Sequence, residues 1–220
     1  MKLSLAGNEV EMLPERAVWW PARGTAVIAD VHLGKDQVFR RSGIAIPAAV
    51  LDSELAMLDS LIRRTRCERL LVLGDWVHAA PVEGESWPTA IARWRAQHDQ
   101  LAIDLVLGNH DRHLSRWLDT WRIDAHLEPM QINGLAMFHE IDPEVPGAGM
   151  SGHLHPVAWL RSGREKARLP AFARRGDHLV LPAFGRFTGG FDGQERGPWK
   201  LFPIAGDRVV ELPPSSGRGR

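Results

Sequence analysis

Five short polar clusters follow apolar runs along this chain, and their side chains are of the kinds that bind metal ions. Each cluster begins where a stretch such as 26–29, 70–73 or 105–107 ends, and these short apolar stretches are typical of buried strands. The clusters, rich in Asp, Asn and His, lie at 30–32, 74–78, 108–111, 139 and 152–155. Because active sites of layered α/β folds gather at the carboxyl ends of strands, we expect the clusters to meet. Oxygen and imidazole ligands together predict a site for two divalent metal ions.

Two of the clusters contain pairs of ligand-type residues with one residue between them. Asp30 and His32 form the first pair, and His153 and His155 form the second. On an extended backbone, alternate residues project to the same side. We therefore expect the carboxylate oxygen and the imidazole nitrogen of the first pair to bind one ion together.

The remaining clusters supply a bridging ligand, further donors and an acid. Asp75 follows a glycine turn, where one carboxylate could bridge two ions, while Asn109 offers a neutral amide oxygen and His139 an imidazole. Two ions about 3.5–4 Å apart can clamp a phosphoryl group and lower the pKa of a water, which becomes the nucleophile. We expect His110 to protonate the leaving oxygen, with the Asp111 carboxylate orienting its ring.

Three more side chains are candidates for substrate binding. His78 could contact substrate or pack behind Asp75, and packing is favoured because the ligand set is complete without it. Arg40 and Arg112 follow the first and third clusters closely, where a guanidinium could reach a phosphate; the alternative is an ordinary solvated arginine. Alone, each cluster motif, such as D-x-H or G-N-H-D, is more often a turn with a solvated or capping side chain. Their joint occurrence at the ends of apolar runs favours the metal site.

The composition is that of an ordinary globular protein. The chain has 220 residues, of which 44% are hydrophobic, and a formal net charge of zero, so no overall field attracts it to nucleic acid or membranes. Its only cysteine, Cys67, cannot form an internal disulfide, and neither a signal-peptide core nor a membrane-spanning run is recognisable. We expect a cytoplasmic protein with no membrane partner, one domain over 1–212 and a flexible tail over 213–220.

The elements that must position the clusters differ between the two halves of the chain. In the first half, apolar runs alternate with segments of helical spacing, which predicts β-α-β-α-β units around a parallel sheet. The elements predicted there are a hairpin over 3–12, strands at 17–20, 26–29, 70–73 and 103–107, helices beginning at Pro47 and Ser86, and a short helix over 112–119. The second half predicts mostly strands, after the turn at 133–134 and at 150, 157–160, 178–181, 199–203 and 208–212.

Basic residues crowd the segment 161–175, which we expect to be a surface loop. Its cations, with Glu165 as the only acid among them, are Arg161, Arg164, Lys166, Arg168, Arg174 and Arg175. Such a segment could follow a DNA backbone, but a run of charge is more often simply a solvated face.

The order of the clusters, D-x-H, G-D, G-N-H-D, H and G-H-x-H, resembles the calcineurin-like metallophosphoesterase superfamily. The resemblance runs from Asp30 to His155. It implies an α/β fold, a four-layer α/β/β/α sandwich of two mixed sheets with the two metal ions at its top edge. The implied ligands are Asp30, His32, Asp75 and His155 for one ion and Asp75, Asn109, His139 and His153 for the other, with His110 as the acid.

Three stretches narrow the resemblance. They are A-D-V-H-L-G-K over 29–35, F-R-R-S-G-I over 39–44 and P-A-F-G-R-F-T-G-G over 182–190, and they resemble the bacterial ligase-associated DNA damage response endonuclease group, the PdeM group. This resemblance implies manganese-dependent hydrolysis of phosphodiester bonds in DNA, a role in DNA repair, and a functional association with a DNA ligase, a helicase and an exonuclease. Mn²⁺ is therefore the first candidate metal, although the mixed nitrogen and oxygen ligands also suit Fe, Co or Zn.

Two other functions fit parts of the sequence. A phosphodiesterase of small substrates such as cyclic nucleotides agrees with the zero net charge, because nucleic-acid enzymes are often visibly basic. A non-catalytic scaffold would use the sandwich only as a docking surface, and such a protein should have lost ligands. All seven ligand-type residues are present, so the sequence favours an enzyme.

Overall fold

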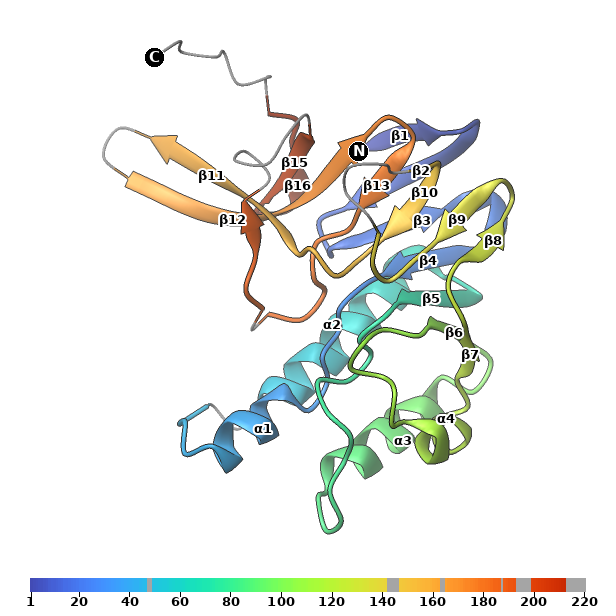
Figure 1. Ribbon diagram of the computed structural model, residues 1–220, viewed down its shortest axis with the longest axis vertical. Helices are drawn as coiled ribbons and strands as arrows, with labels where there is room; N and C mark the ends of the chain where they lie inside the picture. Colours follow the sequence, from blue (N-terminus) through green and yellow to red (C-terminus); the bar gives the residue numbers. More distant parts are fainter. Residues whose placement is uncertain (47–48, 142–146, 163–164, 187, 193–198, 213–220) are drawn as a thin grey trace.

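The computed structural model contains two mixed β-sheets packed face to face, with α-helices on one outer side (Figure 1). It describes residues 1–46, 49–141, 147–162, 165–186, 188–192 and 199–212. The α/β class and the two mixed sheets predicted from the sequence are confirmed. The predicted tail at 213–220 lies outside the described residues. No helix among those described has the length and apolar character needed to span a membrane.

The first sheet has seven strands in chain order. They are β1 (Lys2–Leu5), β2 (Asn8–Leu13), β3 (Ala17–Trp20), β4 (Thr25–Ile28), β5 (Arg69–Leu73), β6 (Ala102–Val106) and β7 (Asp124–His126). Strands β1 to β4 pair antiparallel, and β4 to β7 pair parallel. The central strands are continuous apolar runs because both faces of the sheet are covered. Their carboxyl ends meet at one edge, where three of the polar clusters begin.

All four α-helices lie on the same side of this sheet, and all but the first, which adds no apolar side chain to the buried cluster, cover its face (Figure 1). They are α1 (Lys35–Arg41), α2 (Val50–Thr65), α3 (Trp87–Gln97) and α4 (Ser115–Trp121), and a 3₁₀ turn, η1, spans Pro21–Arg23. The apolar stripe of α2 includes Leu51, Leu55 and Leu58, which recur at helical spacing and belong to one buried cluster. That cluster also contains Ile28 and Val72 from the sheet, so this face carries the helix layer.

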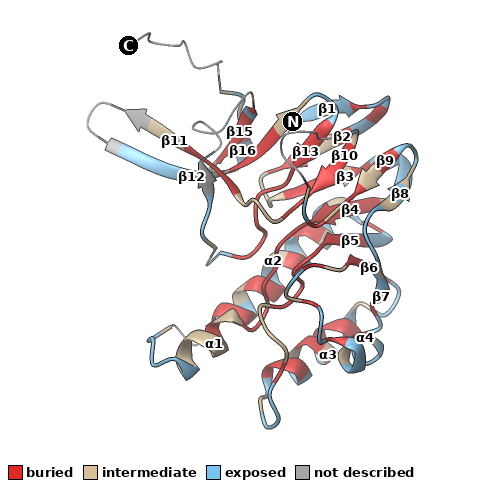
Figure 2. Ribbon diagram, viewed as in Figure 1, coloured by how far each residue is buried: buried red, intermediate tan, exposed pale blue. Residues whose placement is uncertain are grey.

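The second sheet pairs strands that are far apart in the sequence. Its order is β14 (Phe191–Asp192), β11 (Pro156–Ser162), β12 (Glu165–Arg175), β13 (His178–Val180), β10 (Gly149–Ser151), β9 (Leu135–Met137) and β8 (Met130–Ile132), and β15 (Lys200–Ala205) pairs with β12 and with β16 (Arg208–Val209). Leu71 and Leu73 of the first sheet share a buried cluster with Met150 and Phe172 of the second. This inter-sheet core is the continuous buried region in the middle of Figure 2.

The structure differs from the sequence-based expectation at the second outer layer. Among the described residues no α-helix follows α4, whereas the four-layer sandwich implied a second helix layer. The outer face of the second sheet carries a small apolar cluster instead, with Ala173, Val180, Trp199 and Leu201 among its members. The described part of the chain from β8 onward consists of strands and their connections, so it contains no helix that could form a second helix layer.

The segment 161–175 was predicted to be a surface loop, but its described residues, 161–162 and 165–175, belong to two paired strands. Strands β11 and β12 pair antiparallel in a register that places Trp159 opposite Arg168, and the hairpin extends away from the sheets (Figure 1). The sequence does show the alternation of a strand, because Lys166, Ala167, Arg168 and Leu169 alternate polar and apolar. The many charged residues in this segment made a solvated loop the more natural interpretation. Helix α1, only seven residues long, was also not predicted.

Candidate metal centre

Left-handed backbone turns aim the ligand-type side chains. Asp30, His32 and Asp75 have φ angles of 55°, 54° and 55°, and His153 and His155 have 64° and 46°. They are five of the ten described non-glycine residues with positive φ, a conformation that costs about 1–3 kcal/mol each and collects at functional sites. The expectation that each pair alternates along an extended strand was therefore wrong. The side chains meet because the backbone turns at each of them.

The first group of donor atoms comprises Asp30, His32 and His155. One donor atom from each residue lies within 4.8 Å of the other two, and Asp30 Oδ1 is 3.3 Å from His155 Nε2. Asp30 Oδ1, both ring nitrogens of His32 and His155 Nε2 are buried and accept or donate no hydrogen bond. Burial also lowers the pKa of His32 to about 2, so its ring is neutral and its lone pair is free. Buried polar atoms without partners are costly, and these fit a bound cation.

The second group comprises Asp75, Asn109, His139 and His153. His139 Nδ1 lies 3.1 Å from the carbonyl oxygen of Leu73, which can only accept, so a neutral His139 carries its lone pair on Nε2. That nitrogen faces Asn109 Oδ1 at 2.9 Å and Asp75 Oδ1 at 3.6 Å, and His153 Nδ1 is 3.1 Å away. Electron-rich atoms aimed at one point repel one another unless a cation lies between them. This donor set fits a divalent metal ion.

Asp75 joins the two groups. Its Oδ1 is on the side of His139, and its Oδ2 lies 3.9 Å from His32 Nε2. The carboxylate is buried, and burial raises its pKa, whereas the charge of His139 lowers it. Bound dications would favour the ionised carboxylate further. One side chain thus faces both candidate metal positions, as the sequence analysis expected of a bridge.

Glycines and Asp111 hold these turns together. A Cβ at Gly74 would overlap the His139 ring, so only glycine lets β5 pass this close to that ligand. Asp111 Oδ2 accepts the backbone N–H groups of Asp75 at 2.8 Å and Gly108 at 3.0 Å, and burial raises the pKa of Asp111 to about 6. We expected Asp111 to orient the ring of His110. Its contacts show instead that it ties the turn after β5 to the turn after β6.

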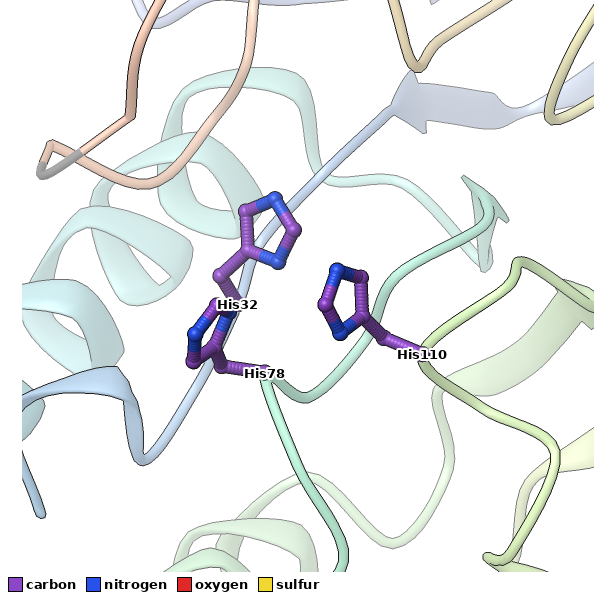
Figure 3. Close-up of side chains that lie close together, drawn as sticks. All are labelled: His32, His78 and His110. Carbon is purple, nitrogen blue, oxygen red and sulfur yellow. The ribbon is translucent and has the colours of Figure 1, made fainter. Parts of the chain in front are cut away.

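The rings of His32, His78 and His110 lie close together (Figure 3). The Nε2 atoms of His32 and His110 are each 3.9 Å from Asp75 Oδ2. His110 stacks on His78 with ring centroids 4.9 Å apart, and His32 meets both edge-on at 5.4 and 5.5 Å. His110 is about one-third exposed. Burial lowers the pKa of His78 to about 4, and the charge of Lys35 lowers it further, so the His78 ring is neutral at pH 7. His110 therefore reaches the site from the solvent side with His78 packed behind it.

The structure does not bring the two candidate substrate-binding arginines to this cluster. Arg40 lies on α1, where its guanidinium pairs with Asp36 at 3.2 Å and donates to the carbonyl of Ile46 at 3.4 Å. Arg112 is exposed before α4, and within the described part of the chain nothing links it to the metal-binding side chains. A substrate-binding role for either one stays a prediction.

Sequence reasoning missed two neighbouring titratable side chains near the site, the half-buried Lys35 and the buried Glu54. Lys35 opens α1, and although burial lowers its pKa, the charges of Glu54, Asp75 and Asp30 oppose that shift. Glu54 on α2 is 2% exposed, and burial, followed by the charge of Asp36, raises its pKa to about 8. The signal was available, because Glu54 lies one turn after Leu51 on the apolar stripe of α2. A carboxyl group at a core position of a helix is unusual and indicates a special role.

Comparisons with known proteins agree with this geometry. The family model of the calcineurin-like phosphoesterases matches residues 25–194, a span that holds all seven ligand-type residues. Among solved structures, the nuclease MPE of Pseudomonas putida is similar, with 32% sequence identity and a TM-score of 0.82. The match covers 96% of this chain and 99% of that one. No curated protein matches the chain.

Proposed function

The chain belongs to the calcineurin-like phosphoesterase family, and we propose that it is a nuclease that hydrolyses phosphodiester bonds of DNA with two divalent metal ions. One observation carries the proposal: two groups of donor atoms meet at the buried carboxylate of Asp75, and the first group contains buried atoms without hydrogen-bond partners. A scaffold would have no reason to retain such a costly arrangement.

Each side chain has a task in this proposal. Asp30, His32 and His155 would hold one ion, Asn109, His139 and His153 the other, and Asp75 both. Two bound divalent ions supply Lewis acidity toward the phosphoryl oxygens and lower the pKa of a water that can attack phosphorus. His110, partly exposed beside Asp75, would donate a proton to the leaving oxygen. The stacked His78 ring limits the orientations that His110 can adopt.

The choice of DNA and of manganese rests on similarity and on ligand chemistry. The similar solved protein is a nuclease, and the likeness extends over nearly the full length of both chains. The stretches at 29–35 and 182–190 resemble the ligase-associated endonuclease group. We therefore infer cleavage within DNA strands, a role in DNA repair, and functional association with a ligase, a helicase and an exonuclease. The mixed nitrogen and oxygen ligands are compatible with Mn²⁺, Fe, Co or Zn, and the family resemblance makes Mn²⁺ the first candidate.

Parallel assays on three substrates test the proposal. Purified protein, stripped with a chelator and reloaded with Mn²⁺, would be given circular single-stranded DNA, circular duplex DNA and bis-p-nitrophenyl phosphate. We expect metal-dependent cleavage of at least one circle, because a circle has no end from which an exonuclease could start. Hydrolysis of the nitrophenyl diester with both circles left intact would favour the small-substrate phosphodiesterase instead.

A further inference from the structure

A cavity of about 180 Å³ opens beside the metal centre and shares one wall with it. His155 lines the cavity and also belongs to the first group of metal-binding donors. The other walls come from β11, from β12 and from residues within 182–186 and 188–189. A substrate strand with one phosphodiester at the metal centre would therefore continue directly into this cavity.

The cavity is lined by three arginines and by no carboxylate. Arg16, Arg168 and Arg186 lie in its walls, and none of its lining residues is Asp or Glu. Arg16 has a structural role, because its Nη1 donates to the carbonyls of Ala183, Phe184 and Gly185. These hydrogen bonds hold in place the backbone that precedes Arg186. Burial lowers the pKa of Arg16, and the charge of Arg186 lowers it further, which shows that these two cations lie close together.

Arg168 and Arg186 keep their donors available for a ligand. Both side chains are exposed. Arg186 donates Nε to the sulfur of Met57 at 3.2 Å, a weak acceptor. Its charge also acts on the carboxyl group of Glu54, but among the described residues its two terminal nitrogens make no hydrogen bond. Arg168 has no hydrogen-bond or carboxylate partner in the described residues. A guanidinium presents a fork of N–H donors that matches the oxygens of a phosphate.

A glycine makes room for Arg168 in this position. A Cβ at Gly190 would overlap Arg168 Nη2, would lie 2.5 Å from Val157 Cγ1 and would lie 3.0 Å from the carbonyl oxygen of His155. Any larger residue would push Arg168 away from the strand that follows the metal ligand. Gly190 thus has a use beyond a tight turn: it lets a cationic side chain lie against the backbone next to the candidate metal centre.

We propose that Arg168 and Arg186 form a subsite for a second, non-scissile phosphodiester of the nucleic-acid strand. The inference rests on the proposed nuclease function and deepens it, because it names the residues that would bind a nucleic-acid strand but not a small diester. A single-phosphate substrate reaches only the metal centre, whereas a strand also engages the two guanidiniums. Of the basic residues in 161–175, Arg174 instead donates to the carbonyls of Ser4 and Gly176, so it belongs to the framework of the sheet.

The test compares substrates that differ by one phosphodiester. The dinucleotide d(TpT) has one, d(TpTpT) has two, and bis-p-nitrophenyl phosphate has one without nucleosides. Wild-type protein should cleave the trinucleotide with a kcat/KM about tenfold or more above that of the dinucleotide, as expected for charge-assisted hydrogen bonds. In the double variant Arg168→Gln/Arg186→Gln this ratio should fall to about two, the statistical factor for two cleavable bonds. Hydrolysis of the nitrophenyl diester should stay unchanged.

Control variants separate the subsite from general effects of charge. Arg93→Gln removes an exposed arginine on α3 and should leave the ratio at its wild-type value. Arg168→Lys/Arg186→Lys keeps the charge without the fork and should give an intermediate ratio; it also serves if the Gln variant does not fold. Binding of an oligothymidylate, followed by fluorescence anisotropy against salt, should lose about 0.7 of its log–log slope for each phosphate contact removed.

The outcomes distinguish the subsite from the function on which it rests. If wild-type and double-variant proteins cleave both oligonucleotides with the same ratio, the subsite assignment is wrong while the nuclease function stands. An equal loss on bis-p-nitrophenyl phosphate would show that the arginines support the metal centre instead. If wild-type protein hydrolyses the nitrophenyl diester but neither the oligonucleotides nor the DNA circles, the nuclease proposal fails and the subsite fails with it.

Discussion

At the scale of single residues, Asp75 is the side chain on which both candidate metal positions depend, because its two oxygens face His139 and His32. Asp75→Ala should lower the metal content of the protein and reduce kcat/KM by more than about 100-fold, since loss of even an indirect ligand contact costs about 10–100-fold in affinity or activity. Metal analysis after gel filtration measures the occupancy. Two ions per chain in this variant would show that Asp75 is not the bridge.

His110 should affect rate rather than metal content. Its Nε2 is 3.9 Å from Asp75 Oδ2 and its ring is partly exposed, which suits proton donation to the leaving group. His110→Ala should keep both ions and lose about 10²–10⁴-fold in kcat on DNA. The loss should be much smaller on bis-p-nitrophenyl phosphate, because nitrophenolate leaves without a proton. The same loss on both substrates would assign His110 to the metals or to the phosphate.

The seven ligand-type residues could be predicted from the sequence because their chemistry and their position after apolar runs are both local properties. The backbone at those residues could not. Asp30 and His155 adopt left-handed turns that the surrounding sheets impose, and nothing in a D-x-H or H-x-H pattern specifies a positive φ. The role of Asp111 was missed for a similar reason, because its partners are backbone N–H groups brought near only by the fold.

At the scale of elements, the central strands could be predicted and the charged or short elements could not. Strands β4, β5 and β6 are nearly all apolar because helices cover one face and the second sheet covers the other. Strand β12 has its outer half in solvent, so its sequence is charged and resembles a loop. Helix α1 is too short to show a helical period.

Helix α2 carries a titratable group whose effect on stability can be measured. The pKa of Glu54 is raised to about 8 in the folded chain, first by burial. Between pH 4.5 and 8 the unfolded chain releases this proton while the folded chain keeps it, so folding stability falls as pH rises, by up to about 1.4 kcal/mol per unit. Glu54→Gln cannot titrate and should lose less stability between pH 5 and pH 8.

Urea unfolding of metal-free protein at pH 5 and pH 8 measures this difference. Metal-free protein is required because a nearby dication would itself favour the carboxylate. Asp52→Asn, on an exposed position of the same helix, is the matched control and should follow the wild-type pH dependence. Identical pH dependence in the wild type and Glu54→Gln would mean that Glu54 is ionised in the folded chain.

At the scale of the whole molecule, the candidate metal centre joins the two sheets. Its ligand-type residues come from turns after β4, β5 and β6 of the first sheet and from the segments after β9 and β10 of the second. Ions that bind only the folded chain should therefore stabilise it as a unit, by about 2.7 kcal/mol at a metal concentration 100 times Kd. Mn²⁺ should raise the unfolding temperature of wild-type protein. The same rise in His139→Ala would place the bound metal elsewhere.

The most direct test of the central claim is a titration of Mn²⁺ into chelator-treated protein while hydrolysis of single-stranded DNA is followed. The paired donor groups and the shared Asp75 predict that metal-free protein is inactive and that the rate saturates at two ions per chain. Full activity in metal-free protein, or saturation at a single ion, would contradict a two-metal phosphodiesterase.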